Sequence, residues 1–330
     1  VTSTKNQWIN NYLVEKEGFL RVNDTIYNSF DDAVAAVETE GTIYVIRDVK
    51  NYFVGTIPAE KNITFDLNGY NYETTQPITN KGTFKVIDSS EEKTGLLYNP
   101  KTRTLINQGT MTIDGANIKS AEIVIYGNSG NGTVTLLNEG TLTGNVGVYF
   151  DSAQTFVMES GTITASGIGV RLQADSSNFT MNDGYIEASS HGVYRYGWKN
   201  KTTINNGHIK SLSQTGILMD RSHSNSSYWS TLIINDGLIE GAVYGVRNYS
   251  TYFTINSGEI RSNSTNIDHY ALICDSYSPC TINESEEKTT LINAPLASGI
   301  YMNSDVKMNA GRIYAGAPSA FGVYQNSCTF

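Results

Sequence analysis

The residues best suited to chemistry in this sequence are aromatic and arginine side chains between residues 194 and 252. Flat rings with a polar tip stack on sugar faces and anchor protein partners, so this composition predicts a binding surface. The alternative for any single tyrosine is that it covers a sheet, because tyrosine has a high β-propensity. The candidate binding residues are Tyr194, Tyr196, Trp198, Tyr228, Trp229, Arg247, Tyr249 and Tyr252.

A second group of residues in the same region could support catalysis. Sugar cleavage needs two carboxylates, or an acid and a base, in one groove. His191, Arg195, Asp220 and His223 could converge in such a groove. The sequence therefore keeps a polysaccharide lyase or glycoside hydrolase as an alternative class, but it assigns no catalytic residue.

Cysteines, histidines and paired acids give no metal or cofactor motif. The histidines are scattered, and no Cys/His spacing suits zinc. Cys274 is expected to be a small apolar core residue, with a Cys274–Cys280 disulfide as the alternative. Glu91–Glu92 and Glu286–Glu287 lie in two copies of Ser-Glu-Glu-Lys-Thr. We interpret these copies as polar loops, with a cation site as the alternative, and we predict no metal and no cofactor.

Overall composition excludes some classes of partner. Only 17% of the residues are charged and the net charge is −9, which argues against a broad nucleic-acid surface. No apolar run is long enough to span a bilayer. The chain begins at Val1, so we expect that a leader has been removed.

The elements that position these residues are short strands in a repeated unit. Residues 179–196 alternate apolar and polar positions, which is typical of half-buried strands, and turn at Asn182-Asp183-Gly184. Gly161, Gly184 and Gly207 lie 23 residues apart, and a degenerate corner is expected near 283–285. The corner glycines are Gly115, Gly140, Gly161, Gly184, Gly207, Gly237, Gly258 and Gly311.

A repeat of about 23 residues, with three strands and three corners, predicts one coil of a parallel β-helix. The alternative is an antiparallel sandwich, but sandwiches do not repeat one sequence at a fixed period. A second set of glycines, such as Gly192 before Val193, predicts a column of outward side chains. That column is Tyr149, Arg171, Tyr194, Leu218, Arg247, Ile273, Tyr301 and Tyr324.

The chain divides into two predicted parts. Residues 1–40 should form a hairpin turning at Asn23-Asp24 and a short helix after the N-cap Ser29, which would cover the first coil. Residues 6–13 could form a short helix or an extended arm. Residues 41–330 should form the β-helix, and we expect the chain to stop in mid-solenoid, because no closing element follows Phe321–Asn326.

Three motifs near the start carry a family resemblance. Ser-Phe-Asp-Asp-Ala-Val at 29–34, Gly-Thr-Ile-Tyr-Val-Ile at 41–46 and Lys-Asn-Ile-Thr-Phe-Asp-Leu-Asn-Gly at 61–69 resemble the pectin-lyase-like right-handed parallel β-helices. These occur in large surface proteins of gut Firmicutes. The resemblance covers essentially the whole chain and implies an all-β, single-stranded right-handed parallel β-helix. It says little about function, because that fold carries lyases, hydrolases, tailspikes and adhesins.

The hydrolase motifs that the resemblance would imply are absent. Only Ser190-His191-Gly192 approaches a Gly-His-Gly motif. We therefore expect an exported bacterial cell-surface β-helix that acts as a non-catalytic adhesin. Its partners would be a host or dietary glycan, or a host glycoprotein, and further domains of a longer chain, without nucleic acid or membrane insertion. A structural stalk is a further alternative.

Overall fold

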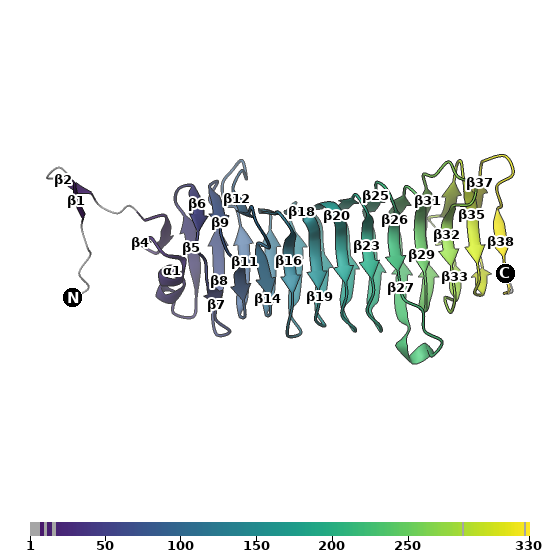
Figure 1. Ribbon diagram of the computed structural model, residues 1–330, viewed down its shortest axis with the longest axis horizontal. Coiled ribbons are helices and arrows are strands. Elements are labelled where there is room, and N and C mark those ends of the chain that lie inside the picture. Colours follow the sequence, from purple (N-terminus) through teal and green to yellow (C-terminus); the bar gives the residue numbers. More distant parts are fainter. Residues whose placement is uncertain (1–6, 10–11, 15–17, 286, 327) are drawn as a thin grey trace.

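The chain forms an elongated parallel β-solenoid of about 12 turns, with about 23 residues per turn (Figure 1). The computed structural model describes residues 7–9, 12–14, 18–285, 287–326 and 328–330. The prediction of an all-β parallel β-helix with one short helix near the N-terminus is confirmed. Within these residues no helix is long and apolar enough to cross a membrane.

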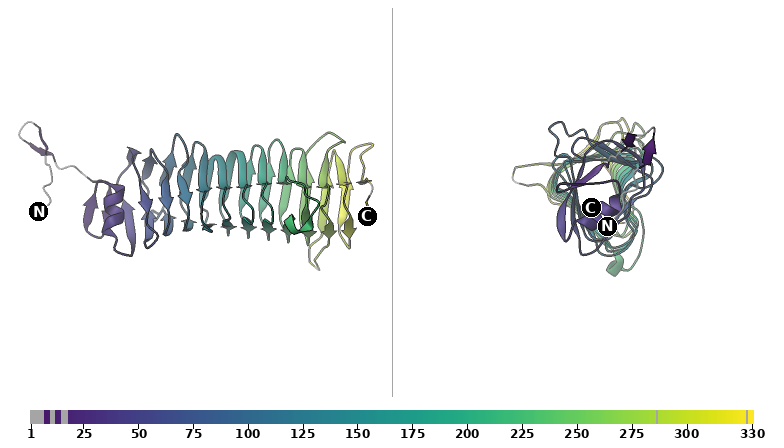
Figure 2. Two further views of the ribbon diagram at one scale, coloured as in Figure 1. Left: turned by 60° about the horizontal axis from the view of Figure 1, so that its bottom comes forward. Right: turned by 90° about the vertical axis from the view of Figure 1, so that its left-hand side faces the viewer.

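Each coil contributes one strand to each of three faces, which surround a common interior (Figure 2). Face one begins with an antiparallel hairpin and continues with parallel strands in exact sequence order. Its strands are β4 (Thr25–Tyr27), β3 (Leu20–Val22), β5 (Glu40–Val45), β8 (Asn62–Asp66), β11 (Thr83–Ile87), β14 (Thr110–Asp114), β17 (Thr133–Leu137), β19 (Thr155–Met158), β21 (Asn178–Met181), β24 (Lys201–Ile204), β27 (Ser230–Ile234), β30 (Thr251–Ile255), β33 (Cys280–Ile282) and β36 (Val306–Met308).

Faces two and three are joined, because β18 (Thr141–Phe150) and β20 (Thr162–Leu172) run through both. Face two also holds β6 (Val49–Tyr52), β9 (Asn71–Thr74), β12 (Leu96–Asn99), β15 (Asn117–Ser120), β22 (Tyr185–Ala188), β25 (His208–Ser211), β28 (Leu238–Gly241), β31 (Gly258–Ser262), β34 (Thr290–Ala294) and β37 (Arg312–Ala315). Face three also holds β7 (Thr56–Ile57), β10 (Ile78–Asn80), β13 (Leu105–Asn107), β16 (Ile123–Gly127), β23 (His191–Arg195), β26 (Thr215–Met219), β29 (Tyr244–Asn248), β32 (Tyr270–Cys274), β35 (Ser298–Met302) and β38 (Val323–Gln325).

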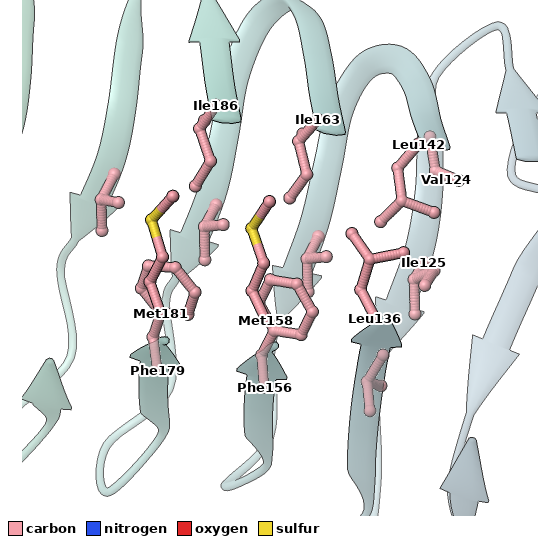
Figure 3. Close-up of a cluster of buried hydrophobic side chains, with 14 of the residues drawn as sticks. Val124, Ile125, Leu136, Leu142, Phe156, Met158, Ile163, Phe179, Met181 and Ile186 are labelled. Atoms are coloured by element: carbon pink, nitrogen blue, oxygen red, sulfur yellow. The ribbon is translucent and has the colours of Figure 1, made fainter. Parts of the chain in front are cut away.

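The core consists of equivalent side chains stacked from coil to coil (Figure 3). Because successive strand residues point to opposite faces, every second residue enters the interior. Phe156 and Phe179 stack with ring centroids 5.3 Å apart, and Met158 pairs in register with Met181. Ile163 and Ile186 approach them from face two. Identical residues in register give each coil the same packing partner, so one repeat specifies the next.

The turn from face one to face two needs a left-handed backbone at a glycine in most coils. Gly184 has φ +111°, and a Cβ there would lie 2.6 Å from the carbonyl oxygen of Gly161 in the preceding coil. A side chain would therefore strain the backbone and collide. The prediction fails at Gly140, where Asn138 and Glu139 adopt the positive φ values instead. The predicted corner near residues 283–285, which lacks a glycine, follows the end of β33 at Ile282.

An asparagine ladder runs along this same corner. The amide of each asparagine donates to the side-chain oxygen of the equivalent residue one coil earlier, at 2.6–3.1 Å, and the last acceptor is the carboxylate of Glu159. Each amide thus satisfies its neighbour in a regular row. The ladder comprises Asn182, Asn205, Asn235, Asn256, Asn283 and Asn309.

The N-terminal elements cover the first coil as predicted. The hairpin turns at Asn23, which has φ +49°, and α1 (Phe30–Ala36) follows. The backbone N–H of Asp32 donates to Ser29 Oγ at 3.3 Å, so Ser29 is the N-cap. Phe30 is buried against Phe65 of the solenoid. Before it, β1 (Gln7–Ile9) pairs with β2 (Tyr12–Val14), so the described residues of the predicted arm are extended, and residues 6, 10 and 11 lie outside the described ranges.

One interior column of face three contains polar residues that the sequence did not predict to lie in the core. Cys274 lies in it, buried and with a free thiol, as expected of a core residue, and the alternative disulfide to Cys280 is not formed. Arg195 and Asn248, however, occupy the same column. Phe150, Leu172, Met219 and Met302 in the same column are apolar.

Candidate binding surface

The predicted outward column on face three is confirmed by the strand register. Tyr194 and Arg247 are separated in it by Leu218, so they do not touch. Tyr126 extends the column by one coil beyond the predicted set. The column places aromatic rings and guanidinium groups on one face at the spacing of neighbouring strands, about 4.8 Å.

The polar groups in this column contact each other or neighbouring acidic side chains. The Arg171 guanidinium lies over the rings of Tyr149 and Tyr194, 4.8 and 5.7 Å from their centroids. The Tyr194 hydroxyl donates to Asp220 at 2.9 Å. Burial and the bond to Asp220 raise the pKa of Tyr194 to about 12. Arg247 pairs with Asp275 at 3.5 Å. Most of the hydrogen-bond donors of this column therefore already have partners within the protein.

The Tyr249 ring packs on Arg247 of face three, and the other remaining predicted residues gather at the corner between face three and face one. The insertion before β27 contains a 3₁₀ turn, η1 (Ser226–Tyr228), and protrudes in green beside β27 in Figure 1. The exposed rings there are those of Tyr196, Tyr228, Tyr252 and Tyr277, with 36%, 39%, 47% and 44% of each residue exposed. We name these four tyrosines, with the side chains packed against them, the corner surface.

Two indoles form the base of the corner surface rather than its exposed part. Trp198 is only 8% exposed and contacts His223 and Tyr228 edge-on, with centroids 5.3 and 6.2 Å away. Trp229 packs on Tyr252 at 4.9 Å and on Tyr277 at 6.2 Å. Trp198 and Trp229 therefore orient the exposed tyrosines, and replacing either would disturb the packing as well as any binding.

Three residues of the corner surface were not among the predicted binding residues, although His223 was named as a possible catalytic residue. Tyr277 comes from the next coil and packs on Trp229. His223 touches Trp198 and Tyr228, with a centroid distance of 4.6 Å to the latter. Arg221 lies over the Trp198 ring at 4.4 Å. All three occur beside an aromatic residue or an insertion, which is the only signal that the sequence offered.

The proposed catalytic group of His191, Arg195, Asp220 and His223 is not assembled. Arg195 is fully buried, because strand alternation directs it into the solenoid. Its Nη2 donates to the carbonyl of Tyr249 at 2.7 Å and to Thr251 Oγ1 at 2.9 Å, and its Nη1 to the carbonyl of Gly197 at 3.4 Å. Burial lowers the pKa of Arg195 to about 10, although nearby Asp220 partly offsets this.

Arg195 therefore supports the corner surface from inside. The three acceptors belong to corners of different coils, at Gly197 and at Tyr249–Thr251. A buried arginine is tolerated only where acceptors are arranged around its guanidinium. Its role here is to fix the backbone beneath Tyr196 and Trp198, not to take part in acid–base chemistry.

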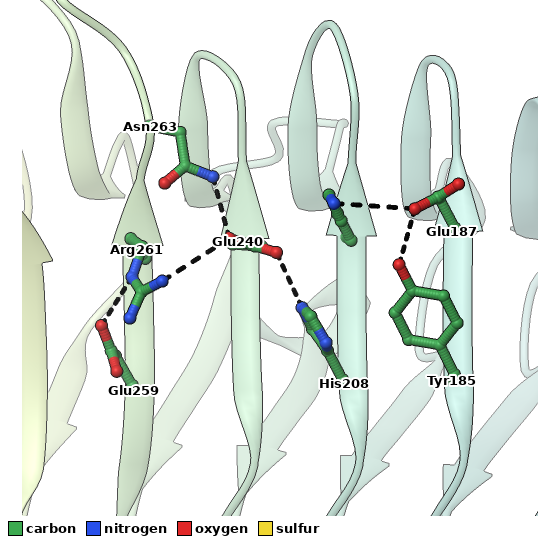
Figure 4. A network of polar contacts seen from close by, with 8 residues as sticks. Tyr185, Glu187, His208, Glu240, Glu259, Arg261 and Asn263 are labelled. Atoms are coloured by element: carbon green, nitrogen blue, oxygen red, sulfur yellow. Dashed lines mark hydrogen bonds and ion pairs between the residues drawn. The ribbon is translucent and has the colours of Figure 1, made fainter.

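A charged network on face two was not predicted (Figure 4). Glu240 is largely buried and accepts from His208 at 2.8 Å and from Asn263 at 2.9 Å, with Arg261 at 3.8 Å. Glu187 accepts from Tyr185 at 2.6 Å. In the sequence, the acids and bases of this row all stand three residues after a corner glycine. They are Glu187, Lys210, Glu240 and Arg261.

This network has the composition of a catalytic site but not its geometry. Acids and bases alternate along the row, so each carboxylate faces a base in the next coil. Burial raises the pKa of Glu240, but hydrogen bonds from Asn263 and His208 and nearby positive charges more than offset it, so the pKa lies below its ordinary value. A general acid needs a raised pKa. The row therefore stabilises the sheet.

Two depressions at one corner of the solenoid lie away from the predicted binding residues. They have volumes of about 540 and 390 Å³, follow the corner between faces two and three and share Lys119, Ser120 and Ala121. Neither includes a predicted binding residue. In the described ranges no cluster of three or more His, Cys, Asp or Glu could hold a metal ion, and Glu286 of the second acidic loop is outside them.

Comparisons with known proteins identify no relative. No family model matches this chain, and neither the curated proteins nor the solved structures searched gave a significant match.

Proposed function

We propose that this chain is a non-catalytic binding module, exported and held at a bacterial cell surface, which binds a glycan through the corner surface. The observation that carries the proposal is the group of four exposed tyrosine rings, three of which pack on two indoles. Rings whose edges are already packed have lost their rotational freedom, so stacking on a sugar costs less entropy.

The two alternatives fit the structure less well. A lyase or hydrolase would need an uncompensated acid next to a base, and the candidate group of His191, Arg195, Asp220 and His223 fails because Arg195 is internal. A plain stalk needs only the repeated coil, yet the insertion before β27 lengthens one coil and presents Tyr228. Insertions on one side of a solenoid commonly carry its binding site. Cell-surface location follows from the family resemblance alone.

A glycan array with single-site variants tests this proposal. Tyr228→Ala and Tyr252→Ala each remove one exposed ring without opening the core, and each is expected to weaken binding about tenfold. Tyr314→Ala is the matched control, because Tyr314 is 54% exposed and lies on face two. The same glycans should yield no new reducing ends. New ends, or binding that both variants retain, would contradict the proposal.

A further inference from the structure

We propose that the ligand of the corner surface is an acidic glycan, whose carboxylate or sulfate is bound by Arg221. This inference rests on the proposed function and adds the chemical class of the ligand. It is based on the arrangement of Arg221, Lys199 and the two rings that hold the guanidinium.

Arg221 is held in place by rings and not by acceptors. Its Cζ lies 4.8 Å from the Tyr196 centroid and 4.4 Å from the Trp198 centroid. In the part of the chain that the structure describes, no oxygen accepts a hydrogen bond from its guanidinium, and no carboxylate pairs with it. A guanidinium carries five N–H donors in a rigid plane that matches carboxylate and sulfate oxygens. Arg221 thus has its donors free and its position fixed.

Three other arginines of the solenoid surface are already engaged. Arg171 donates to Gln173 at 2.9 and 3.2 Å, Arg247 pairs with Asp275, and Arg261 pairs with Glu259 at 2.8 Å. These arginines are structural, because their donors satisfy neighbouring oxygens. Unlike Arg171 and Arg247, which also lie over tyrosine rings, Arg221 has aromatic support without an oxygen partner among the described residues.

The charges around Arg221 favour an anion. Lys199 Nζ lies 5.3 Å from the Tyr228 centroid, and within the described residues it too has no carboxylate partner. The nearby acids are turned toward the protein, since Asp220 accepts from Tyr194 and Asp175 accepts from the backbone N–H of Trp198 at 2.8 Å. Among the described residues, Arg221 and Lys199 therefore form a local patch of two cationic groups without carboxylate partners beside the exposed tyrosines.

The insertion adds neutral donors and no acid. Residues 222–227 read Ser-His-Ser-Asn-Ser-Ser. His223 Nδ1 accepts from the backbone N–H of Asn225 at 2.9 Å, which leaves Nε2 as the ring's donor. Hydroxyls, an imidazole N–H and exposed rings next to a guanidinium suit a sugar that bears an acidic group. A net charge of −9 makes general attraction of anions by the whole molecule weak, so binding requires this local patch.

Matched glycan pairs test the inference. Each pair has an acidic member and its neutral counterpart, carboxyl-reduced in one set and desulfated in the other, so the two sets distinguish carboxylate from sulfate. We expect the acidic member to bind at least tenfold more tightly and more weakly at high salt. Arg221→Gln should remove this preference, and Arg221→Lys should restore only part of it, because lysine keeps the charge without the planar fork.

The control is Arg312→Gln, since Arg312 is exposed on face two, far along the solenoid. It should leave both members of each pair unaffected, and all variants should keep the wild-type melting temperature. Equal binding of acidic and neutral members, unchanged in Arg221→Gln, would overturn the acidic-ligand inference while the proposed binding function stands. Absence of binding to every glycan would overturn both.

Discussion

Glu240 is the residue whose environment makes a pH-dependent contribution to stability. Because its pKa in the folded chain is lowered below the ordinary 4.5, it stabilises the fold above the pKa of the unfolded chain. That contribution is lost as the pH falls through the folded-state pKa. Since Glu240 accepts hydrogen bonds from His208 and Asn263 through its two carboxylate oxygens, replacing one oxygen by an amide nitrogen leaves one of these donors without an acceptor.

We predict that Glu240→Gln destabilises the protein at pH 7 by about 1–3 kcal/mol, the usual range for hydrogen bonds to a charged group. The difference from wild type should shrink as the pH is lowered from 5 to 3, about the range in which a carboxylate of lowered pKa protonates. Urea midpoints measured at each pH check this. Glu60→Gln, at an exposed position, is the control and should show no pH-dependent difference. A constant difference for Glu240→Gln would contradict the prediction.

For single residues, the alternation of inward and outward positions along a strand predicted which side chains point outward. It did not predict which polar side chains contact each other. Tyr194 and Arg247 lie where the period of two places them. Arg195 obeys the same alternation and is therefore internal, against the expectation that a charge faces solvent. Its acceptors come from Gly197 and Tyr249 at separate corners, and sequence spacing does not reveal such three-dimensional convergence. Trp198 is buried for a similar reason, because Arg221 and His223 from the next coil cover it.

At the scale of the element, the corner between faces one and two depends on cooperation between coils. Asn235 donates to Asn205 and accepts from Asn256, both at 2.7 Å. Asn309 stands at the end of the ladder, is exposed, and donates only to Asn283. An interior asparagine of the ladder therefore makes two hydrogen bonds to neighbouring side-chain amides, whereas the terminal asparagine makes one.

Asn235→Ala should cost about 1–3 kcal/mol, because it leaves one donor and one acceptor of its neighbours without a partner. Asn309→Ala is the matched comparison and should cost less than about 1 kcal/mol. Urea-induced unfolding gives both values. Equal losses for the two variants would show that the ladder amides act independently and are replaced by water.

The sequence contains the signal for this ladder, since an asparagine follows the last buried strand residue in coil after coil. The glycine of each corner was identified, while the asparagine was treated only as a turn former. The exception at Gly140 has a local cause: that corner is one residue longer, so Asn138 and Glu139 make the turn before the glycine is reached. A sequence repeat predicts the usual corner between two strands well. It predicts a longer corner poorly, because the positive φ can then fall on a residue other than the glycine.

At the scale of the whole molecule, each coil contacts mainly the coils on either side. Stability is then close to a sum of coil and interface terms, and unfolding can start at an end. The described N-terminal end is covered by α1, whose Phe30 packs on Phe65 with a centroid distance of 5.9 Å. The corner surface lies many coils away, near β27, so its integrity should be largely independent of this cap.

Phe30→Ala should therefore lower protection from hydrogen exchange near α1, and this effect should decline within a few coils along the solenoid. Removing a buried phenylalanine costs about 3–5 kcal/mol, which should loosen α1 and the coils of β5 and β8 beneath it. Hydrogen exchange resolved along the chain should show faster exchange there and wild-type protection at β24–β30. Phe179→Ala removes an equally buried ring from the central stack and should instead loosen β19, β21 and β24. Uniform loss of protection in Phe30→Ala would show that the solenoid unfolds as one cooperative unit, and the corner surface would then depend on the cap.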